Sequence, residues 1–182
     1  MSKIYDLVII GGGPAGLSAG IYAGRAKMNT LIIEKGELGG QVNKTFDISN
    51  YPGSRNTNGP KLMSEMRAQA EDFKVKFMNG EVLEVSLYED IKEIKTDKGL
   101  VKGRSVIIAT GAAPRQLGFK GEEEFTGRGV AYCATCDGQF FEGLEVFVIG
   151  AGFAAAEEAI FLTRFASKVT VIAREPEFTC AK

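Results

Sequence analysis

One unit, a strand followed by a glycine turn and a helix, occurs twice in the sequence and constrains the fold more than any other feature. The apolar run from Asp6 to Ile10 leads directly into Gly11-Gly12-Gly13-Pro14-Ala15-Gly16, and an Ala-rich stretch with helical spacing follows. The run from Glu145 to Ile149 leads in the same way into Gly150-Ala151-Gly152. The two turns start 139 positions apart (11 and 150). Two copies of this unit predict two nucleotide-binding-type folds in series.

Hydrophobic spacing predicts the other elements of both units. In the first unit, we expect a helix over 17–28 and a buried strand over 30–33 that ends at Glu34. A Gly-rich loop over 35–60, a helix over 61–73, two or three short strands within 75–97 and a strand over 105–109 follow. In the second unit, we expect a helix over 153–165 and a strand over 169–172. Strands that alternate with helices in this way predict the α/β class.

Turn formers and charged residues collect between Pro114 and Glu124, which indicates a boundary there. We therefore predict one domain over residues 1–117 and a second over 118–182. A complete Rossmann-like half needs about three strands with crossover helices, yet only ten residues follow Ile172. We expect the chain to be a fragment, or a partner chain to complete it.

Composition disfavours several classes of function. Lys and Arg total 22 against 23 Asp and Glu, a formal net charge of −1, which argues against a surface for duplex nucleic acid. No apolar run approaches the ~18 residues of a membrane span, and the apolar start is too short for a signal peptide, so a cytoplasmic location is expected. The absence of His removes His-based catalysis and most transition-metal sites. Three Cys do not suit a disulfide-stapled secreted scaffold.

The first glycine turn fits the dinucleotide-binding fingerprint. Gly11 would make the tight turn, Gly13 would let the backbone approach a pyrophosphate, and Gly16 would let the helix pack close to the strand. Glu34 follows Gly11 by 23 positions, at the end of the next strand, where a carboxylate accepts hydrogen bonds from ribose hydroxyls. The alternative is a purely structural turn with an exposed glutamate.

The second chemical signal is Cys133-Ala134-Thr135-Cys136, a pair of cysteines with two residues between them. A zinc site would need two further ligands, and only Cys180 remains, with no His. We therefore interpret the pair as redox-active, with zinc binding and inert thiols as the alternatives. Asp137 follows directly and is either a proton donor to a departing thiolate or a helix cap. Cys180 is expected to be an unremarkable side chain.

Together these motifs make the whole chain similar to the low-molecular-weight thioredoxin reductases, a family of FAD-dependent disulfide reductases. The resemblance implies an FAD-binding Rossmann-like domain of three layers (ββα), followed by the start of a second, incomplete Rossmann-like domain. The motifs that carry it are Gly11 to Gly16, Gly39-Gly40-Gln41, Asn50-Tyr51-Pro52-Gly53, Ala109-Thr110-Gly111-Ala112, Gly127-Arg128-Gly129-Val130 and Cys133-Ala134-Thr135-Cys136-Asp137-Gly138.

The resemblance also implies the residues that bind FAD. Those at the pyrophosphate would be Gly11, Gly13, Pro14, Ala15 and Gly16, with Glu34 at the adenosine ribose and Val82 near the adenine. Those along the flavin would be Gly40, Gln41, Asn50, Thr110 and Gly111.

The same resemblance implies a path for electrons, from a donor to the flavin, to Cys133–Cys136, and on to a thioredoxin-like protein. In the family the second cysteine, here Cys136, faces the flavin. The first, Cys133, attacks the thioredoxin disulfide, and Asp137 handles protons. The family is usually dimeric, so a homodimer of the full-length protein is expected.

Two departures from the family concern the electron donor. Where NADPH-dependent members carry several cations for the 2′-phosphate, this chain has only Arg174, followed by Glu175, and Phe153 replaces a small polar residue at the second turn. Both departures resemble the ferredoxin-dependent flavin thioredoxin reductases. Ferredoxin is therefore the expected donor, NAD(P)H is doubtful, and NADH and NADPH stay open. The alternatives for function are an NAD(P)H-dependent thioredoxin reductase, an FAD-dependent dithiol oxidase and a non-catalytic FAD-binding fragment.

Overall fold

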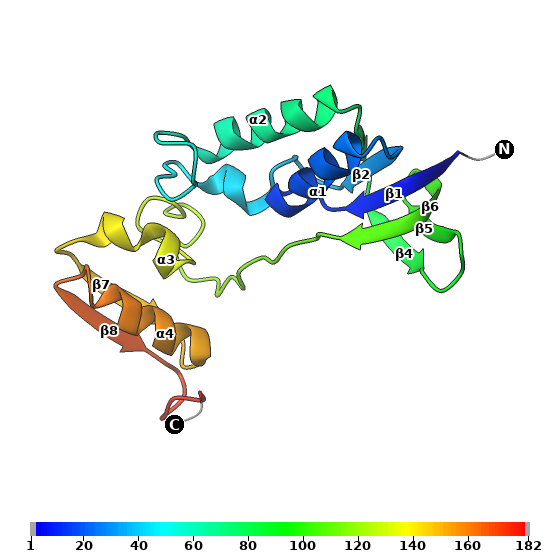
Figure 1. Ribbon diagram of the computed structural model, residues 1–182. Helices are drawn as coiled ribbons and strands as arrows, with labels where there is room; N and C mark the ends of the chain where they lie inside the picture. The colour runs from blue at the N-terminus through cyan, green and yellow to red at the C-terminus, as the bar shows by residue number, and fades with distance from the viewer. Residues whose placement is uncertain (1–2, 181–182) are drawn as a thin grey trace. The chain divides into compact units, whose positions relative to one another are not determined.

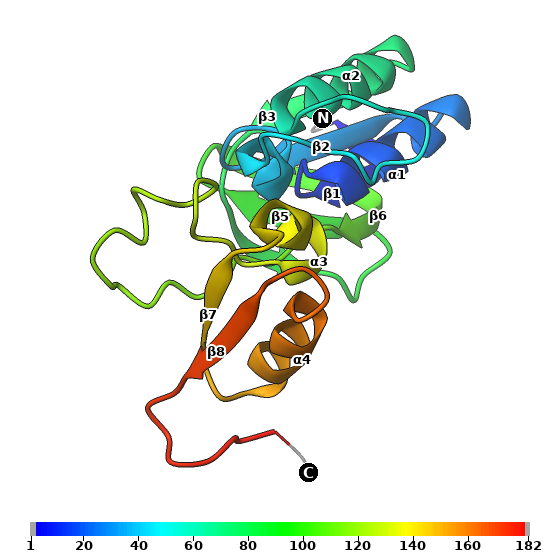
Figure 2. The same cartoon turned by 90° about the vertical axis from the view of Figure 1, so that its left-hand side faces the viewer.

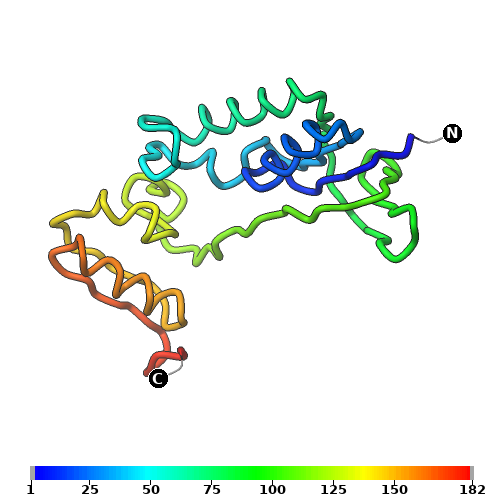
Figure 3. Tube along the Cα trace, in the orientation of Figure 1, coloured from blue at the N-terminus to red at the C-terminus, as the bar shows by residue number. Residues whose placement is uncertain are grey.

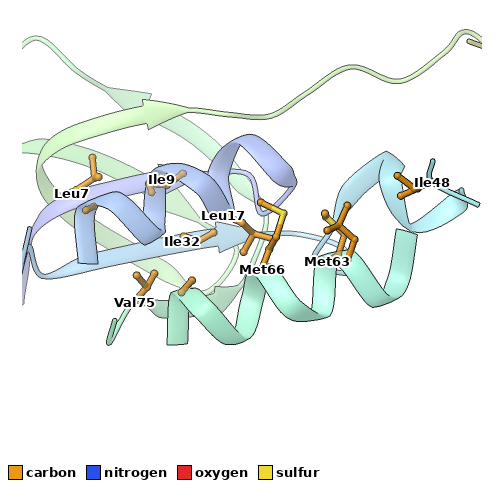
Figure 4. Close-up of a cluster of buried hydrophobic side chains, with 11 residues drawn as sticks. Leu7, Ile9, Leu17, Ile32, Ile48, Met63, Met66 and Val75 are labelled. Carbon is orange, nitrogen blue, oxygen red and sulfur yellow. The ribbon is translucent and has the colours of Figure 1, made fainter. Parts of the chain in front are cut away.

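Strand β1 (Ile4–Ile10) sends alternate side chains into two hydrophobic cores in the computed structural model, which describes residues 3–180. Leu7 and Ile9 point towards helices α1 (Pro14–Arg25) and α2 (Gly59–Asp72), and Figure 4 shows the side chains that meet there. This core contains Leu7, Ile9, Leu17, Ala23, Ile32, Ile48, Leu62, Met63, Met66, Ala70 and Val75.

The opposite face of β1 belongs to a second core. Val8 and Ile10 pack there with Leu31 and Ile33 of β2 (Thr30–Glu34), and with Ile94 and Val101 of the antiparallel strands β5 (Lys92–Thr96) and β6 (Gly99–Ile108). Helices on one face and an antiparallel ribbon on the other make three layers around a parallel sheet (Figure 1). The predicted three-layer α/β fold of the first domain is confirmed.

The six strands of this unit form one sheet in the order β3-β2-β1-β6-β5-β4. The first four strands in that order are parallel to one another, and β5 and β4 extend the sheet in antiparallel fashion. Neighbouring parallel strands need crossover connections, which α1 and α2 provide. The bounds are β2 (Thr30–Glu34), β3 (Lys76–Asn79), β4 (Val82–Ser86), β5 (Lys92–Thr96) and β6 (Gly99–Ile108).

Strand β6 is twice as long as predicted because it has two partners. Its first half pairs antiparallel with β5, and its second half pairs parallel with β1. Gly103 lies where both partners meet, and a Cβ at that position would come within 2.8 Å of a Val8 methyl. The prediction of a strand that starts at residue 105 was wrong, because Lys102 and Arg104 interrupt the apolar pattern of the first half.

The long segment between β2 and α2 contains more regular structure than the predicted loop. It contains a 3₁₀ helix η1 (Gly40–Lys44) and an isolated antiparallel bridge between Ile48 and Thr57. Asn58 caps α2, because its side-chain oxygen accepts a hydrogen bond from the Lys61 N–H at 2.9 Å.

The chain has two compact units, residues 1–113 and 114–182. The stretch that follows β6 has no helix or strand until residue 134 (Figure 3). The predicted domain boundary between residues 117 and 118 stays a prediction.

The second unit repeats the start of the first. Its two strands are parallel, with Glu145 opposite Lys168 and Ile149 opposite Ile172, and one helix connects them (Figure 2). This is the predicted beginning of a second Rossmann-like fold. The elements are α3 (Ala134–Asp137), η2 (Gly138–Phe141), β7 (Glu145–Ile149), α4 (Phe153–Leu162) and β8 (Lys168–Ile172). Across residues 3–180, no helix is long and apolar enough to cross a membrane.

Candidate functional site

The first glycine turn is fixed in place from three sides by backbone hydrogen bonds. The Gly11 N–H donates to the Ile33 carbonyl of β2 at 2.8 Å, and the Ala109 N–H donates to the Ile10 carbonyl at 2.8 Å. The Gly39 N–H donates to the Gly12 carbonyl at 2.9 Å. The turn therefore lies at the carboxyl ends of the parallel strands, where open α/β sheets bind ligands.

Three glycines of this turn have different physical roles. Gly11 has φ +109°, which favours glycine, and a Cβ there would collide with the Ala109 carbonyl. A Cβ on Gly16 would collide with the Gly11 carbonyl, so Gly16 permits the close packing of α1 on β1. Gly13 has an ordinary φ of −76°, and its nearest neighbour would be the Gly39 carbonyl oxygen at 4.0 Å. The space beside Gly13 is open, as a backbone that receives a pyrophosphate requires.

Glu34 stabilises the turn, and its carboxylate can accept further hydrogen bonds. Its two carboxylate oxygens accept hydrogen bonds from the Gly12 N–H at 2.8 Å and the Gly36 N–H at 3.0 Å. A carboxylate offers about four lone-pair sites, so these two bonds leave about two acceptor sites for ribose hydroxyls.

A second glycine pair lines the same turn. Gly39 and Gly40 both have positive φ, and a Cβ on Gly40 would lie 3.7 Å from the Gly13 Cα. The Asn43 amide donates to the Leu38 carbonyl at 2.8 Å and fixes the bend before η1. Gly11, Gly13, Gly16, Glu34 and Gly40 thus form one cradle, which we call the glycine cradle.

The other predicted cofactor residues differ in their surroundings. Pro14 and Ala15 form the first turn of α1, where backbone N–H groups lack helical partners and favour an anion. Thr110 and Gly111 follow Ala109, the residue after β6, whose N–H donates to the Ile10 carbonyl. Gln41 and Asn50 are exposed, and Val82 packs against the core on the antiparallel side of the sheet. The roles of all these residues in binding stay predictions.

The two cysteines of the CxxC motif are joined in a disulfide. Cys133 and Cys136 have Cα atoms 5.3 Å apart. Cys133 is the N-cap of the short helix α3, and its carbonyl accepts hydrogen bonds from the N–H groups of Cys136 (3.2 Å) and Asp137 (3.0 Å). The motif therefore forms a single turn that brings both sulfurs together.

Asp137 is half-buried at the end of α3, and this burial raises the pKa of its carboxyl group. Its side chain makes no capping hydrogen bond to the following η2. The helix-cap alternative therefore loses support, and the proton-handling role of Asp137 stays a prediction.

Helix α3 and the residue that follows it, Gly138, pack against α4 through contacts that the sequence did not predict. A Cβ on Gly138 would lie 3.3 to 3.4 Å from the rings of Phe161 and Phe165. Burial raises the pKa of the Glu158 carboxyl on α4, and the backbone N–H of Ala134 acts in the opposite direction. No sequence signal connects Glu158 with a residue 24 positions earlier (158 minus 134).

A buried carboxylate also organises the loop before the cysteines. Glu122 is 4% exposed and accepts hydrogen bonds from the Leu117 N–H at 2.9 Å and the Tyr132 hydroxyl at 2.8 Å. The backbone N–H of Leu117, followed by that of Gly118 and the Tyr132 hydroxyl, lowers the pKa of Glu122 against the opposing effect of burial. Tyr132 directly precedes Cys133, so Glu122 ties the motif to residues 117–118.

We expect the stabilisation from Glu122 to be lost in acid. Because its folded pKa lies below the ordinary value of 4.5, the contribution is complete above that value and disappears as pH falls through the folded pKa. Glu122→Gln should unfold more readily at neutral pH and lose less stability than the parent between neutral and acid pH. Thermal unfolding at a series of pH values tests this, with exposed Glu123→Gln as control. Equal pH dependence for Glu122→Gln and the parent would contradict it.

The second glycine turn keeps the shape of the first but not its surroundings. Gly150 has φ +143°, and a Cβ on Gly152 would meet no atom within 4 Å. Phe153 starts α4 with its side chain 60% exposed. The Thr179 N–H donates to the Ala151 carbonyl at 2.8 Å, which ties the segment after β8 to this turn. Within that segment, Arg174 pairs with Glu175 at 3.8 Å.

Cys180 is a free, half-buried thiol in the lining of an open apolar groove of about 740 Å³ on α4 and β8. Within residues 3–180, no group of three or more His, Cys, Asp or Glu side chains is placed to hold a metal ion.

Similar proteins match this chain over nearly its whole length. The "Thioredoxin reductase" of Peptoclostridium acidaminophilum is 51% identical over 183 residues, an alignment that covers 100% of this chain and 58% of that protein. The "Thioredoxin reductase" of Bacillus subtilis (strain 168) is 48% identical over 172 residues, covering 94% and 54%. The chain therefore spans little more than half the length of these relatives.

Solved structures of thioredoxin reductases are also similar to this chain. The crystal structure of thioredoxin reductase from Streptococcus pyogenes MGAS5005 superposes with a TM-score of 0.94 at 46% identity, and the match covers 100% of this chain and 59% of that one. Residues 5–182 match the model of the family described as pyridine nucleotide-disulphide oxidoreductase. The predicted relation to disulfide reductases is confirmed, and the chain belongs to the pyridine nucleotide-disulphide oxidoreductase family.

Proposed function

We propose that the protein carrying this chain is an FAD-dependent disulfide reductase that passes electrons through Cys133–Cys136 to a thioredoxin-like protein. The observation that carries the proposal is the cysteine pair, held as a disulfide on one turn with a half-buried carboxyl group directly after it. The glycine cradle, with open space at Gly13 and free acceptor sites on Glu34, supports FAD as the cofactor. The relatives named above support thioredoxin as the partner.

FAD bound at the cradle would supply the two electrons that reduce the disulfide. The cysteines carry the remaining steps by thiol–disulfide exchange. The Cys133 thiolate attacks one sulfur of the partner's disulfide, which forms a mixed disulfide and releases a partner thiolate. The Cys136 thiolate then attacks the Cys133 sulfur, which releases the second partner thiolate and restores the Cys133–Cys136 disulfide.

Asp137 would supply a proton in this exchange. Its raised pKa leaves part of the carboxyl group protonated closer to neutral pH than an exposed aspartate. A departing thiolate that receives this proton becomes a poor nucleophile, so the reverse reaction is slowed.

The proposed function is tested by reduction of thioredoxin. The flavin of the reconstituted protein is reduced with dithionite without oxygen, excess reductant is removed, and oxidised thioredoxin is added. Flavin reoxidation together with the appearance of thioredoxin thiols is the expected result. Reoxidation by oxygen with a small dithiol as substrate, but none by thioredoxin, would indicate a dithiol oxidase. Failure to retain any flavin would indicate a non-catalytic fragment.

The electron donor is a separate proposal. The description of the family names pyridine nucleotides, so the comparisons do not support the expected ferredoxin or the doubt about NAD(P)H. We nevertheless propose that NADPH in particular is a poor donor. Two local features support this proposal: Arg174 is paired with Glu175, and Phe153 stands at the start of α4. Ferredoxin as donor and a homodimer as the assembled state stay predictions.

We expect reduced ferredoxin to bleach the flavin readily and NADPH to do so poorly. A 2′-phosphate is normally held by several Arg side chains, and loss of two charge-assisted hydrogen bonds weakens binding by roughly two to four orders of magnitude. Stopped-flow mixing with each donor measures this. Rapid bleaching by micromolar NADPH would contradict the proposal, and bleaching by NADH alone would make NADH the donor.

Gly152→Val provides an independent check on the donor. A Cβ at this position would meet no atom of the chain within 4 Å, so the fold should survive, but a valine side chain would block a pyrophosphate at the second turn. Ferredoxin-dependent bleaching should be unchanged in this variant. A loss of bleaching by any pyridine nucleotide that reduces the parent would show that the second turn binds the donor.

A further inference from the structure

The hydroxyl group of Thr135 contacts the sulfur of Cys133, and the proposed exchange does not use this contact. The Thr135 Oγ1 and Cys133 Sγ atoms are 3.4 Å apart. Because that sulfur is bonded to the Cys136 sulfur, it carries no hydrogen, and the hydroxyl is therefore the donor. We propose that Thr135 is a further catalytic residue, whose hydroxyl stabilises the thiolate of Cys133 in the reduced protein. This inference rests on the proposed redox role of Cys133 and Cys136.

The turn of the motif explains why this hydroxyl reaches the sulfur. Cys133 is the N-cap of α3, and Thr135 is the second residue of that helix. An N-cap side chain lies beside the second and third helical residues, where it ordinarily accepts a hydrogen bond from a backbone N–H. In the described part of the chain, the Cys133 side chain makes no such capping bond. The Thr135 hydroxyl donates to its sulfur instead.

The hydrogen bond is stronger in the reduced protein than in the oxidised one. A disulfide sulfur is a neutral, weak acceptor, whereas a thiolate carries a full negative charge. The hydroxyl keeps its proton in both states, so Thr135 forms no covalent bond and acts only through this difference. The contact therefore increases the fraction of Cys133 that is thiolate, the form that attacks the partner's disulfide. It also makes the Cys133–Cys136 disulfide easier to reduce, because it stabilises the reduced form.

Two substitutions at this position separate the hydroxyl from the rest of the side chain. Thr135→Val keeps the β-branched shape and loses the hydroxyl, whereas Thr135→Ser keeps the hydroxyl. The matched control is Thr163→Val, which removes an exposed hydroxyl that donates to the Ile160 carbonyl at 2.6 Å. The carboxyl groups of α3 and of α4, which packs against it, are the same in all variants: Asp137, Glu157 and Glu158.

The first test follows alkylation of Cys133 by iodoacetamide over a range of pH, in a Cys136→Ala background of the whole chain. Mass spectrometry locates the label, and alanine is used because serine would add a second hydroxyl. We expect Thr135→Val to react roughly two- to five-fold slower than the background at about pH 7, and to reach its half-maximal rate at a higher pH. Thr135→Ser and Thr163→Val should match the background.

Two results of this test would overturn the proposal. One is an equal pH profile for Thr135→Val and the background. The other is a slower reaction with an unshifted profile, which would show altered access to the sulfur rather than a less stable thiolate.

The second test uses the intact cysteine pair of the whole chain. The disulfide is titrated with mixtures of reduced and oxidised dithiothreitol at about pH 9, where an ordinary cysteine is mostly thiolate. We expect Thr135→Val to need a roughly two- to five-fold higher ratio of reduced to oxidised reagent at the midpoint, and Thr135→Ser to match the parent. An unchanged midpoint in Thr135→Val would overturn the proposal. Absence of a reversible disulfide in the parent would reject the proposed function, whatever Thr135 does.

Discussion

Gly13→Val is expected to abolish retention of FAD while leaving the fold intact. A valine side chain at this position would enter the open space that receives the pyrophosphate, and the nearest chain atom is the Gly39 carbonyl oxygen at 4.0 Å. Loss of two phosphate contacts to the backbone weakens binding by roughly two to four orders of magnitude. The measurement is flavin absorbance after gel filtration of the reconstituted protein, with circular dichroism to confirm folding.

The same substitution at the second turn gives the matched control. Gly152 occupies the equivalent position, with a similar φ of −85°, and it also has open space around it. Gly152→Val should retain FAD at the parent level. Gly16 is unsuitable for this purpose, because its Cβ would collide with the Gly11 carbonyl and disturb the fold. Equal FAD retention by Gly13→Val and the parent would show that the pyrophosphate does not lie at this turn.

Replacement of either cysteine of the pair should eliminate thioredoxin reduction. Cys133→Ser removes the nucleophile that attacks the partner, and Cys136→Ser removes the group that resolves the mixed disulfide. Each loss should lower turnover by at least about a thousand-fold, as loss of an essential nucleophile does. Cys180→Ser should leave turnover within about two-fold of the parent, since nothing places this thiol in the exchange. Cys136→Ser should also accumulate a mixed disulfide with thioredoxin, which non-reducing electrophoresis detects.

The strands β1 and β2 were predictable because they are buried on both faces. Such strands are continuous apolar runs, as in β1 and β2, and the glycine turn after β1 marks where that strand ends. An apolar run followed by glycines also made the second turn, after β7, recognisable. The burial of β1 and β2 further explains why Gly11, Gly16 and Glu34, which are fixed by these elements, lie together as expected.

The remaining features depend on contacts between distant residues. The first half of β6 pairs with β5, and its glycine and charged residues give no apolar signal. Helices as short as α3 carry too few residues for a periodic pattern. Glu122 looks like a solvated charge in the sequence, and only the folded chain brings it to the Tyr132 hydroxyl and the Leu117 N–H. Side-chain to backbone bonds of this kind have no spacing rule.

Transfer of electrons from the flavin to the cysteine pair is the central step, and thiol counting measures it directly. The oxidised protein is labelled with an alkylating reagent without oxygen, before and after the flavin is reduced, and each cysteine is located by mass spectrometry. We predict that Cys133 and Cys136 are protected before reduction and labelled after it, with Cys180 labelled in both samples. A change confined to Cys180, or stoichiometric zinc on the unreactive pair, would contradict the redox role.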